Sequence, residues 1–475
     1  MTGIGLIFGC ILTPLIGAFF LPLLGNFSKG LRNIAALLMV LTSLVCAGAM
    51  LPAAVAGAPY AWQMELPLGF SFGFLADALA VFMAMTSSLV ASIIVLYSYN
   101  YIEHYDNQNE YYLMAVLFIG AMMGLVLSTN LISIYLFWEI SAICCWRLIG
   151  FYRQPETIRR ANKAFLITVG GALLMLVGFI AIYQQTGTFN LVDMQGVQIT
   201  NAVMALILCG ILSKSATLPL HSWLPDAGVA PSPATSLLHA AVLVKIGVYV
   251  FARLFLVNFT VDPIWNTVLP VICAVSALVS AGAALVENDI KRIIAYSTIS
   301  QLAYILLGLS CGNKIGVYGA LLYIMMHSIA KGGLFLCAGI IEHSIGTKDI
   351  RQMGGLARRL PLTAVAFACC ALSVMGFPPF GGFFAKHLVI EGAYHTGQLW
   401  MAPVFVIGAV MTVMYLMRLF YKVFFGRVSH PDVHEHGWEM ILSVSLMALL
   451  SLFSGIFINL PSGLVNVIIE SMGRW

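Results

Sequence analysis

One segment settles the architecture of this chain: Leu212-Ser213-Lys214-Ser215-Ala216-Thr217-Leu218-Pro219-Leu220-His221-Ser222-Trp223-Leu224-Pro225-Asp226. It ends an apolar run near residues 200–224, which is long enough to cross a membrane because a helical span needs about 20 residues. Pro219 and Pro225 interrupt the helix, since proline removes a backbone hydrogen bond. Such breaks persist at membrane depth only where protein or a wet cavity satisfies the freed carbonyls. The segment therefore predicts a broken membrane helix that carries a buried lysine, Lys214.

Apolar runs of this length recur along the whole chain, in which 61% of the 475 residues are hydrophobic and only 9% are charged. A soluble protein carries about a quarter charged residues, so a soluble enzyme, a disordered chain and a fibrous chain are excluded. The predicted fold class is an all-α polytopic membrane protein of about 14 helices. We expect spans near residues 4–24, 32–56, 73–98, 111–129, 131–151, 162–184, 200–224, 233–256, 264–286, 292–310, 315–343, 361–392, 399–425 and 439–460.

A second break is expected in span 12, at Gly376-Phe377-Pro378-Pro379-Phe380-Gly381-Gly382. When spans 4–8 and 9–13 are taken as two five-helix units, both breaks fall on the fourth helix of their unit. Interrupted helices at corresponding positions indicate a repeated transporter core. The expected organisation is a three-helix segment (1–110), a first repeat (111–256), a second repeat (264–425), and a C-terminal helix with a short tail (426–475).

Ionisable side chains lie inside the predicted spans, and each basic one costs roughly 3 kcal/mol at the bilayer centre. Four embedded lysines would thus cost on the order of 12 kcal/mol unless they are paired or hydrated. We interpret them as a polar pathway, although side chains near span ends could instead reach individually to the membrane surface. The central group is Glu139, Lys214, Lys245, Lys331 and Lys386, and the group near span ends is Arg147, Asp77, Glu342 and Arg418.

Glu139 and Lys214 are the predicted switch, because the glutamate stabilises the charged lysine and burial opposes that charge. Separating them would favour release of the lysine proton.

Histidines supply further steps of the predicted proton pathway. His239 and Lys245 share one helix but point about 120° apart, whereas His327 and Lys331 are four residues apart and share a face. A lone membrane histidine can also be a packing residue, and that alternative stays open for each of these.

The distribution of Lys and Arg predicts orientation. Fourteen of them fall in loops on one side of the predicted membrane, against Arg253, Lys314 and Arg474 on the other. The chain is therefore expected in the plasma (inner) membrane with both termini on the outer, periplasmic side. The acidic residues Glu103, Asp106 and Glu110 are the exception on the inner side.

Net charge and cysteine content exclude further classes of partner and cofactor. The formal charge of +4 does not indicate nucleic acid, and ten cysteines without a CxxC pair predict no cluster, metal or other cofactor.

Several motifs resemble the antiporter-type membrane subunits of respiratory complex I, membrane-bound hydrogenases and multisubunit Na⁺/H⁺ antiporters. The most specific is Lys214 to Ala227, and the segment Asp226 to Pro233 together with the Lys245 helix looks most like the hydrogenase-4 D-type subunit. Further matches are Phe137-Trp138-Glu139, His239 to Lys245, Asp289-Ile290-Lys291-Arg292, Ser297-Thr298-Ile299-Ser300-Gln301, His327 to Lys331, and Gly376 to Lys386.

The resemblance implies fourteen spans, two inverted five-helix repeats, and discontinuous helices 7 and 12. It implies that Glu139 and Lys214 form the coupling ion pair and that Lys245 with His239 is the central relay. It further implies that His327 and Lys331 connect the two halves and that Lys386 is the lysine on the exit side. It leaves Arg147 without a role. Electron transfer in such complexes takes place in a separate hydrophilic redox arm, so the expected partners are that arm, other membrane-arm subunits and the lipid bilayer.

The expected function is that of a proton-translocating subunit of a redox-driven respiratory complex, of membrane-bound hydrogenase or complex I type. The alternative is a subunit of a multisubunit Na⁺/H⁺ antiporter that works without electron transfer, so that Na⁺ joins H⁺ as a candidate ion. A purely structural linker is disfavoured because every charge of the expected pathway is present in the sequence.

Overall fold

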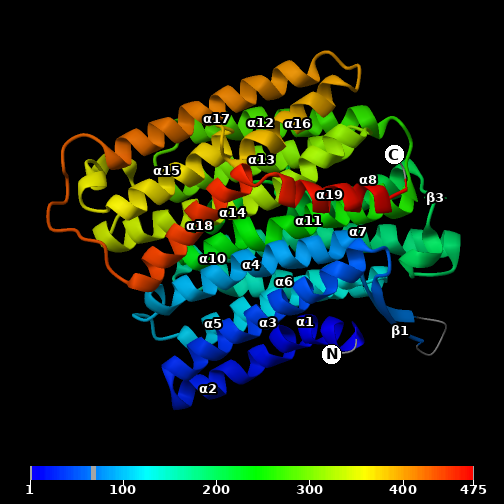
Figure 1. Cartoon of the computed structure of the whole chain (residues 1–475), viewed down its shortest axis with the longest axis horizontal. Coiled ribbons are helices and arrows are strands. Elements are labelled where there is room, and N and C mark those ends of the chain that lie inside the picture. Colours follow the sequence, from blue (N-terminus) through cyan, green and yellow to red (C-terminus); the bar gives the residue numbers. More distant parts are fainter. Residues whose placement is uncertain (1–2, 66–70, 474–475) are drawn as a thin grey trace.

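The computed structural model describes residues 3–65 and 71–473 as a bundle of long, roughly parallel helices (Figure 1). Within this part of the chain, twelve helical segments are long and apolar enough to cross a membrane. Those of the first half are Gly3–Phe27 (α1, Gly3–Gly17, and α2, Leu21–Phe27), α3 (Lys29–Val55), α4 (Ala78–Tyr101), α5 (Gln108–Leu127), α6 (Leu131–Ile149), α7 (Pro155–Thr186), and Ser232–Asn258, which contains α10 (Ser232–Ser236) and α11 (Leu243–Phe251).

The spanning helices of the second half complete the bundle. They are α12 (Trp265–Val286), α13 (Ile290–Ser310), α14 (Lys314–Ile345), α17 (Met401–Phe424) and α18 (Trp438–Ile456). The short α19 (Asn459–Ser471) follows α18 and packs on α14 and α4. The all-α polytopic fold class predicted from the sequence is confirmed.

The two remaining predicted spans are interrupted in the structure. Span 7 consists of α8 (Asn201–Lys214), a turn segment over residues 215–222, and the four-residue α9 (Trp223–Asp226). Span 12 consists of α15 (Pro361–Met375), a turn over residues 376–380, and α16 (Gly381–Tyr394). The predicted breaks at Pro219 and at Pro378–Pro379 are confirmed, whereas the exact count of fourteen spans stays a prediction.

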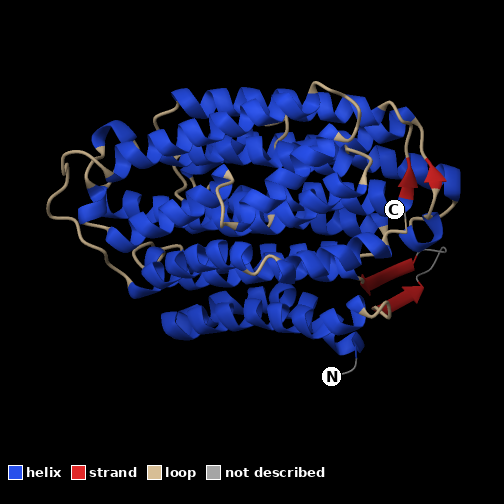
Figure 2. Cartoon of the chain, turned by 45° about the horizontal axis from the view of Figure 1, so that its top comes forward, coloured by secondary structure: helices blue, strands red, loops and turns tan. Residues whose placement is uncertain are grey.

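Short strands lie at one end of the helical bundle (Figure 2). β1 (Tyr60–Glu65) and β2 (Ser71–Ala76) form an antiparallel hairpin in which Tyr60 faces Ala76, and β3 (Val197–Gln198) pairs in parallel with β4 (Phe259–Thr260). Both marked chain ends lie toward the end of the bundle that carries β1 (Figure 1). Which side of the membrane this end faces remains a prediction.

The bundle has an inner and an outer set of helices. Nearly all residues of α13 and most residues of α14 are buried, whereas α3 and α17 bury one face and expose large apolar side chains on the other. A helix that is buried all round belongs to the core of a bundle, and an exposed apolar face suits lipid. Most of the ionisable side chains singled out in the sequence lie on the inner helices or at the breaks, away from that outer apolar surface.

Candidate functional site

Lys214 is the last residue of α8 and lies at the first break, completely buried. Its Nζ donates a hydrogen bond to the carbonyl oxygen of Trp138 on α6 at 3.0 Å and lies 5.2 Å from the centroid of the Trp138 ring. The helix therefore ends with an ammonium group that has one neutral acceptor and one aromatic face as neighbours. Both interactions can stabilise a cation that is withdrawn from water.

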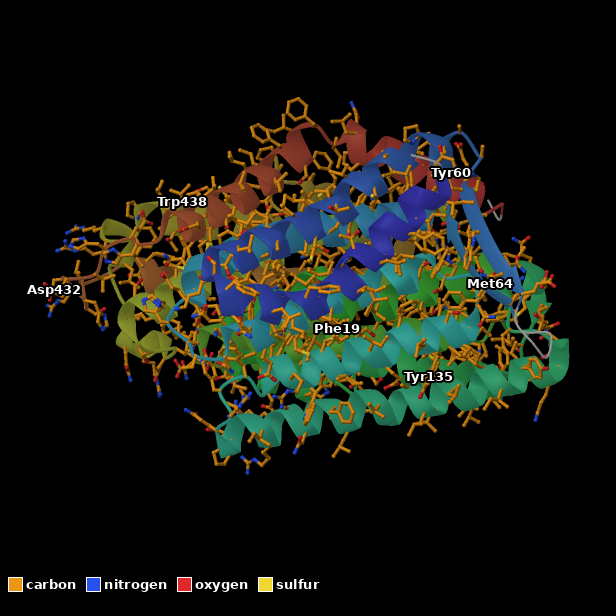
Figure 3. The ribbon with its side chains drawn as sticks, turned by 90° about the horizontal axis from the view of Figure 1, so that it is seen from below. Phe19, Tyr60, Met64, Tyr135, Asp432 and Trp438 are labelled. Atoms are coloured by element: carbon orange, nitrogen blue, oxygen red, sulfur yellow. The ribbon has the colours of Figure 1, made fainter. Side chains whose placement is uncertain are left out.

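Glu139 follows Trp138 on α6, and its carboxylate interacts electrostatically with Lys214. Among the described residues, however, no direct ion pair joins these two side chains. One carboxylate oxygen, Oε1, is buried, and no described residue forms a hydrogen bond with it. Tyr135, one helical turn earlier, also interacts with the carboxylate, and Figure 3 labels it on α6 close to the edge of the bundle. The structure thus places the predicted pair close enough for an electrostatic interaction, with Tyr135 as a second neighbour of the carboxylate.

Lys245 on α11 has a partner on another helix. Its Nζ lies 2.7 Å from Nδ1 of His327 on α14, and both side chains are buried. The sequence placed His239 and Lys245 on one helix but about 120° apart, and among the described residues no direct hydrogen bond joins them. Their joint role as a relay stays a prediction. His239 lies in a π-helical turn over Leu237–Ala241, and within the described part of the chain neither of its ring nitrogens has a hydrogen-bond partner.

The His239 ring packs against Phe335 with centroids 4.5 Å apart, and it also interacts electrostatically with Lys331 and Lys291. Buried polar groups are normally satisfied by protein or by ordered water. His239 therefore belongs to the same charged interior as the lysines, as an electrostatic neighbour of Lys331 and Lys291.

A polar network connects Lys331 with the second break. Lys331 Nζ donates to Ser297 Oγ at 2.5 Å and to the Ile294 carbonyl at 3.3 Å. The Ser297 hydroxyl in turn lies 2.7 Å from the hydroxyl of Tyr415 on α17. Gln301 Nε2 contacts Tyr415, and the Tyr323 hydroxyl donates to Gln301 Oε1 at 2.7 Å.

Lys386 lies at the far side of this network, on α16. Its Nζ is 5.8 Å from the ring centroid of Tyr323 and 5.0 Å from that of Tyr304, and it donates to the Val374 carbonyl at 2.7 Å. The sequence analysis identified Ser297 to Gln301 as a motif but predicted no function for it. The four-residue spacing of Ser297 and Gln301, which places both on one face of α13, was the available signal.

The charges near span ends have ion-pair or hydrogen-bond partners within the protein. Asp77 holds Arg253 through two hydrogen bonds of 2.5 and 2.7 Å. Glu342 pairs with Lys291 at 2.5 Å and with Lys348 at 3.2 Å.

Two further groups complete this set. Arg147, which had no predicted role, forms an ion pair with Glu110 and so ties α6 to α5. Glu110 also pairs with Arg153 at 2.5 Å, although the sequence left this acid without a basic partner. Arg418 donates to the Glu287 carbonyl and to the side chain of Asn288, each at 2.8 Å.

Metal-ligand side chains are dispersed in the part of the chain that the structure describes. No group of three or more His, Cys, Asp or Glu residues there could hold a metal ion, and the ten cysteines are free thiols. What the core offers chemically is a series of proton-binding groups: lysine ammonium groups, imidazoles, hydroxyls and one central carboxylate.

Known proteins resemble this chain in sequence. The family described as NADH:quinone oxidoreductase/Mrp antiporter, TM, matches residues 128–412, and the N-terminal part of NADH-ubiquinone oxidoreductase (complex I) chain 5 matches residues 62–112. The Na(+)/H(+) antiporter subunit A1 of Staphylococcus aureus (strain JH9) is 32% identical over 437 residues, which cover 85% of this chain and 54% of that protein. The chain thus spans about half the length of the curated relatives it matches.

Solved structures show the same fold. A chain of the Mrp complex from Dietzia sp. DQ12-45-1b superposes with a TM-score of 0.91 at 23% identity, covering 99% of this chain and 98% of that one. A chain of respiratory complex I from Thermus thermophilus superposes with a TM-score of 0.84 at 25% identity, covering 98% and 99%. The narrower hydrogenase-4 D-type assignment stays a prediction. Because the family match extends over more than half of its residues, this chain belongs to the NADH:quinone oxidoreductase/Mrp antiporter family of membrane subunits, as its motifs predicted.

Proposed function

We propose that this chain translocates protons across the membrane as one subunit of a larger complex. One observation carries the proposal: four lysines, none more than 4% exposed, lie on inner helices or at the helix breaks of a membrane protein. A structural scaffold has no use for such costly groups. They are Lys214, Lys245, Lys331 and Lys386.

The contacts support an order for these groups. Protons entering from the cytoplasm would load Lys214 beside Glu139 and reach the Lys245–His327 pair, with His239 nearby. From Lys331, the hydroxyl network around Ser297 and Tyr415 leads toward Lys386 on the exit side. Moving one charge against 100 mV costs about 2.3 kcal/mol. A change in the partner of a buried carboxylate is enough to supply energy of that size, since one pKa unit corresponds to about 1.4 kcal/mol.

Two settings fit the family. In the first, the complex is a redox-driven respiratory enzyme of hydrogenase or complex I type. Its hydrophilic arm would carry the electron transfer, and this chain would contribute no cofactor. In the second, the complex is a multisubunit Na⁺/H⁺ antiporter, which the 32% identity to a Na(+)/H(+) antiporter subunit supports equally well. In either case we place the chain in the plasma (inner) membrane with both termini outside.

The test uses inverted membrane vesicles that contain the whole complex, with proton uptake followed by a pH-sensitive dye. Glu139→Gln and Lys214→Ala are each expected to lower the rate of proton uptake at least tenfold while the complex still assembles. Lys422→Ala, an exposed lysine on α17, is the matched control and should leave the rate unchanged. Undiminished uptake in both pathway variants would refute the proposal. Uptake that requires an electron donor indicates the first setting, and uptake driven by a Na⁺ gradient alone indicates the second.

A further inference from the structure

The second helix break is exposed on the surface of the chain. Phe377 is 43% exposed, and Pro378 and Pro379 are also exposed. Neither proline has a backbone N–H, and among the described residues no hydrogen-bond donor reaches the Pro378 carbonyl. Non-helical backbone at membrane depth is tolerated where protein or a water-filled cavity covers it, and not where it faces lipid. The exposed break therefore needs a cover that this chain does not provide.

A polar stripe continues from the break along the outer side of α16. His387, Glu391 and His395 follow one another at four-residue spacing, and their side chains are 66%, 39% and 50% exposed. Each histidine Nε2 lies 3.9 Å from an oxygen of Glu391. With a rise of about 1.5 Å per residue, His387 lies only about 9 Å beyond the start of α16. Because α15 and α16 are of similar length and the break lies between them, we expect His387 within the apolar layer of the membrane.

The neighbouring helix shows what a lipid-facing surface of this protein looks like. α17 lies beside α16 (Figure 1), and its exposed side chains include Val406, Val410 and Met414, all apolar. Polar and ionisable groups at membrane depth normally face other protein or water. The exposed face of α17 is therefore apolar and suited to lipid, whereas the exposed face of α16 is polar and suited to contact with another polypeptide.

We propose that the α16 face, made of residues 377–379, His387, Glu391 and His395, is the contact surface for a different membrane-spanning subunit of the complex. The partner presents hydrogen-bond donors, because the face offers the Pro378 carbonyl and the Glu391 carboxylate as acceptors. The proposal rests on the membership of a multisubunit complex proposed above. Since the buried Lys386 precedes His387 on the same helix, the exit end of the pathway lies next to this contact.

A second copy of this chain is the less suitable occupant. A two-fold axis along the membrane normal would bring the same face of both copies together. Glu391 would then lie opposite its own counterpart, where two carboxylates oppose each other's ionisation. A different subunit with basic or hydroxyl side chains meets no such repulsion.

The direct test places a photo-crosslinker on this face in the complete complex within its native membrane. Tyr394 is 63% exposed and lies seven residues after His387, hence on nearly the same side of α16. Tyr394→p-benzoylphenylalanine is expected to give adducts with a peptide of a different membrane subunit, at least tenfold more than with phospholipid. Val410→p-benzoylphenylalanine on α17 is the control and should show the reverse ratio. Adducts at position 394 that are mainly with phospholipid, or with a second copy of this chain, overturn the proposal.

A second measurement decides the case if position 394 gives few adducts. The double variant His387→Leu/Glu391→Leu makes the face apolar. We expect at least a tenfold loss of the partner subunit during purification, whereas Val410→Leu retains it. Full retention of all subunits together with a raised Tm would mean that the face meets lipid, and would overturn the proposal. Both measurements are independent of transport, so a complex that moves no protons can still confirm or refute this surface.

Discussion

The two broken helices differ in how their exposed backbone is satisfied. At the first break, side chains of other helices complete the bonding: Leu218 N–H donates to Ser276 Oγ at 3.1 Å, and Lys163 Nζ donates to the Ser222 carbonyl at 3.2 Å. The Trp223 indole N–H also donates to the Ser213 carbonyl at 2.9 Å. The first break is therefore stabilised by groups within this chain, from α7 of the first half and from α12 of the second half.

At the second break, the bonds are almost all between neighbouring backbone groups. Gly376 N–H donates to Leu372, Phe377 N–H to Leu372, and Phe380 N–H to Phe377. α18 closes one side by backbone contact, since a Cβ added at Gly455 would collide with the Pro379 carbonyl oxygen. The two lysines differ in the same sense, because Lys214 has a carboxylate near it, whereas a carbonyl and two tyrosine rings are the stabilising neighbours of Lys386 among the described residues. Groups of this chain thus satisfy the backbone of the first break, whereas we infer that another subunit covers the second break.

The strongest challenge to this comparison is removal of the lysine at the second break. Lys386→Ala is expected to lower proton uptake at least tenfold, because the network from Lys331 would end without a proton acceptor. Lys386→Arg should not restore the rate, since arginine does not release its proton in proteins. The measurement is dye-monitored uptake in inverted vesicles, with Lys422→Ala as control. Normal uptake in Lys386→Ala would show that the second break carries no protons.

Packing at the second break gives the next largest effect. Gly455→Ala is expected to lower the free energy of unfolding by about 2–3 kcal/mol, because the new methyl group forces α18 away from the break. Thermal unfolding of the purified complex is the measurement. Gly282→Ala introduces the same methyl group where the nearest atom is 3.9 Å away, and it should change Tm little. Equal Tm values for the two variants would mean that α18 does not support the break.

At the first break, a single hydroxyl can be removed. Ser276→Ala leaves the Leu218 N–H without its acceptor; a fully buried donor left unsatisfied costs about 1–3 kcal/mol, and this one is partly buried. We expect a loss near the lower end of that range, measured as a fall in Tm of the purified complex. Ser454→Ala, at a hydroxyl that bonds within its own helix, is the matched control. An unchanged Tm in Ser276→Ala would weaken the statement that side chains complete this break.

The smallest expected effect concerns Lys163, whose side chain is 42% exposed. Lys163→Ala removes the bond to the Ser222 carbonyl and the 2.8 Å ion pair with Asp226. Partly exposed ion pairs contribute about 0–1 kcal/mol, and salt screens them. The fall in Tm should therefore be slight at low ionic strength and smaller still in high salt. A large loss that is independent of salt would show that the lysine acts mainly through the break.

Sequence reasoning located most of the fold and part of the candidate site. Hydropathy placed the apolar helices, and proline chemistry placed both breaks, since these depend only on neighbouring residues. It also identified Lys214, Lys245, Lys331 and Lys386 as embedded charges. It did not identify the partner of Lys245, because His327 is 82 positions away in the sequence. The pairing of Arg147 with Glu110 escaped it for the same reason.

By itself, the amino-acid sequence determined which segments enter the membrane, where two of them break and which charges they carry inward. These properties follow from local composition and from the missing N–H of proline. Only the tertiary structure decided which groups meet: His327 with Lys245, Ser297 with Lys331, and Ser276 with the first break. Such contacts join helices that are far apart along the chain, and packing selects among many helix faces that look equally suitable in the sequence.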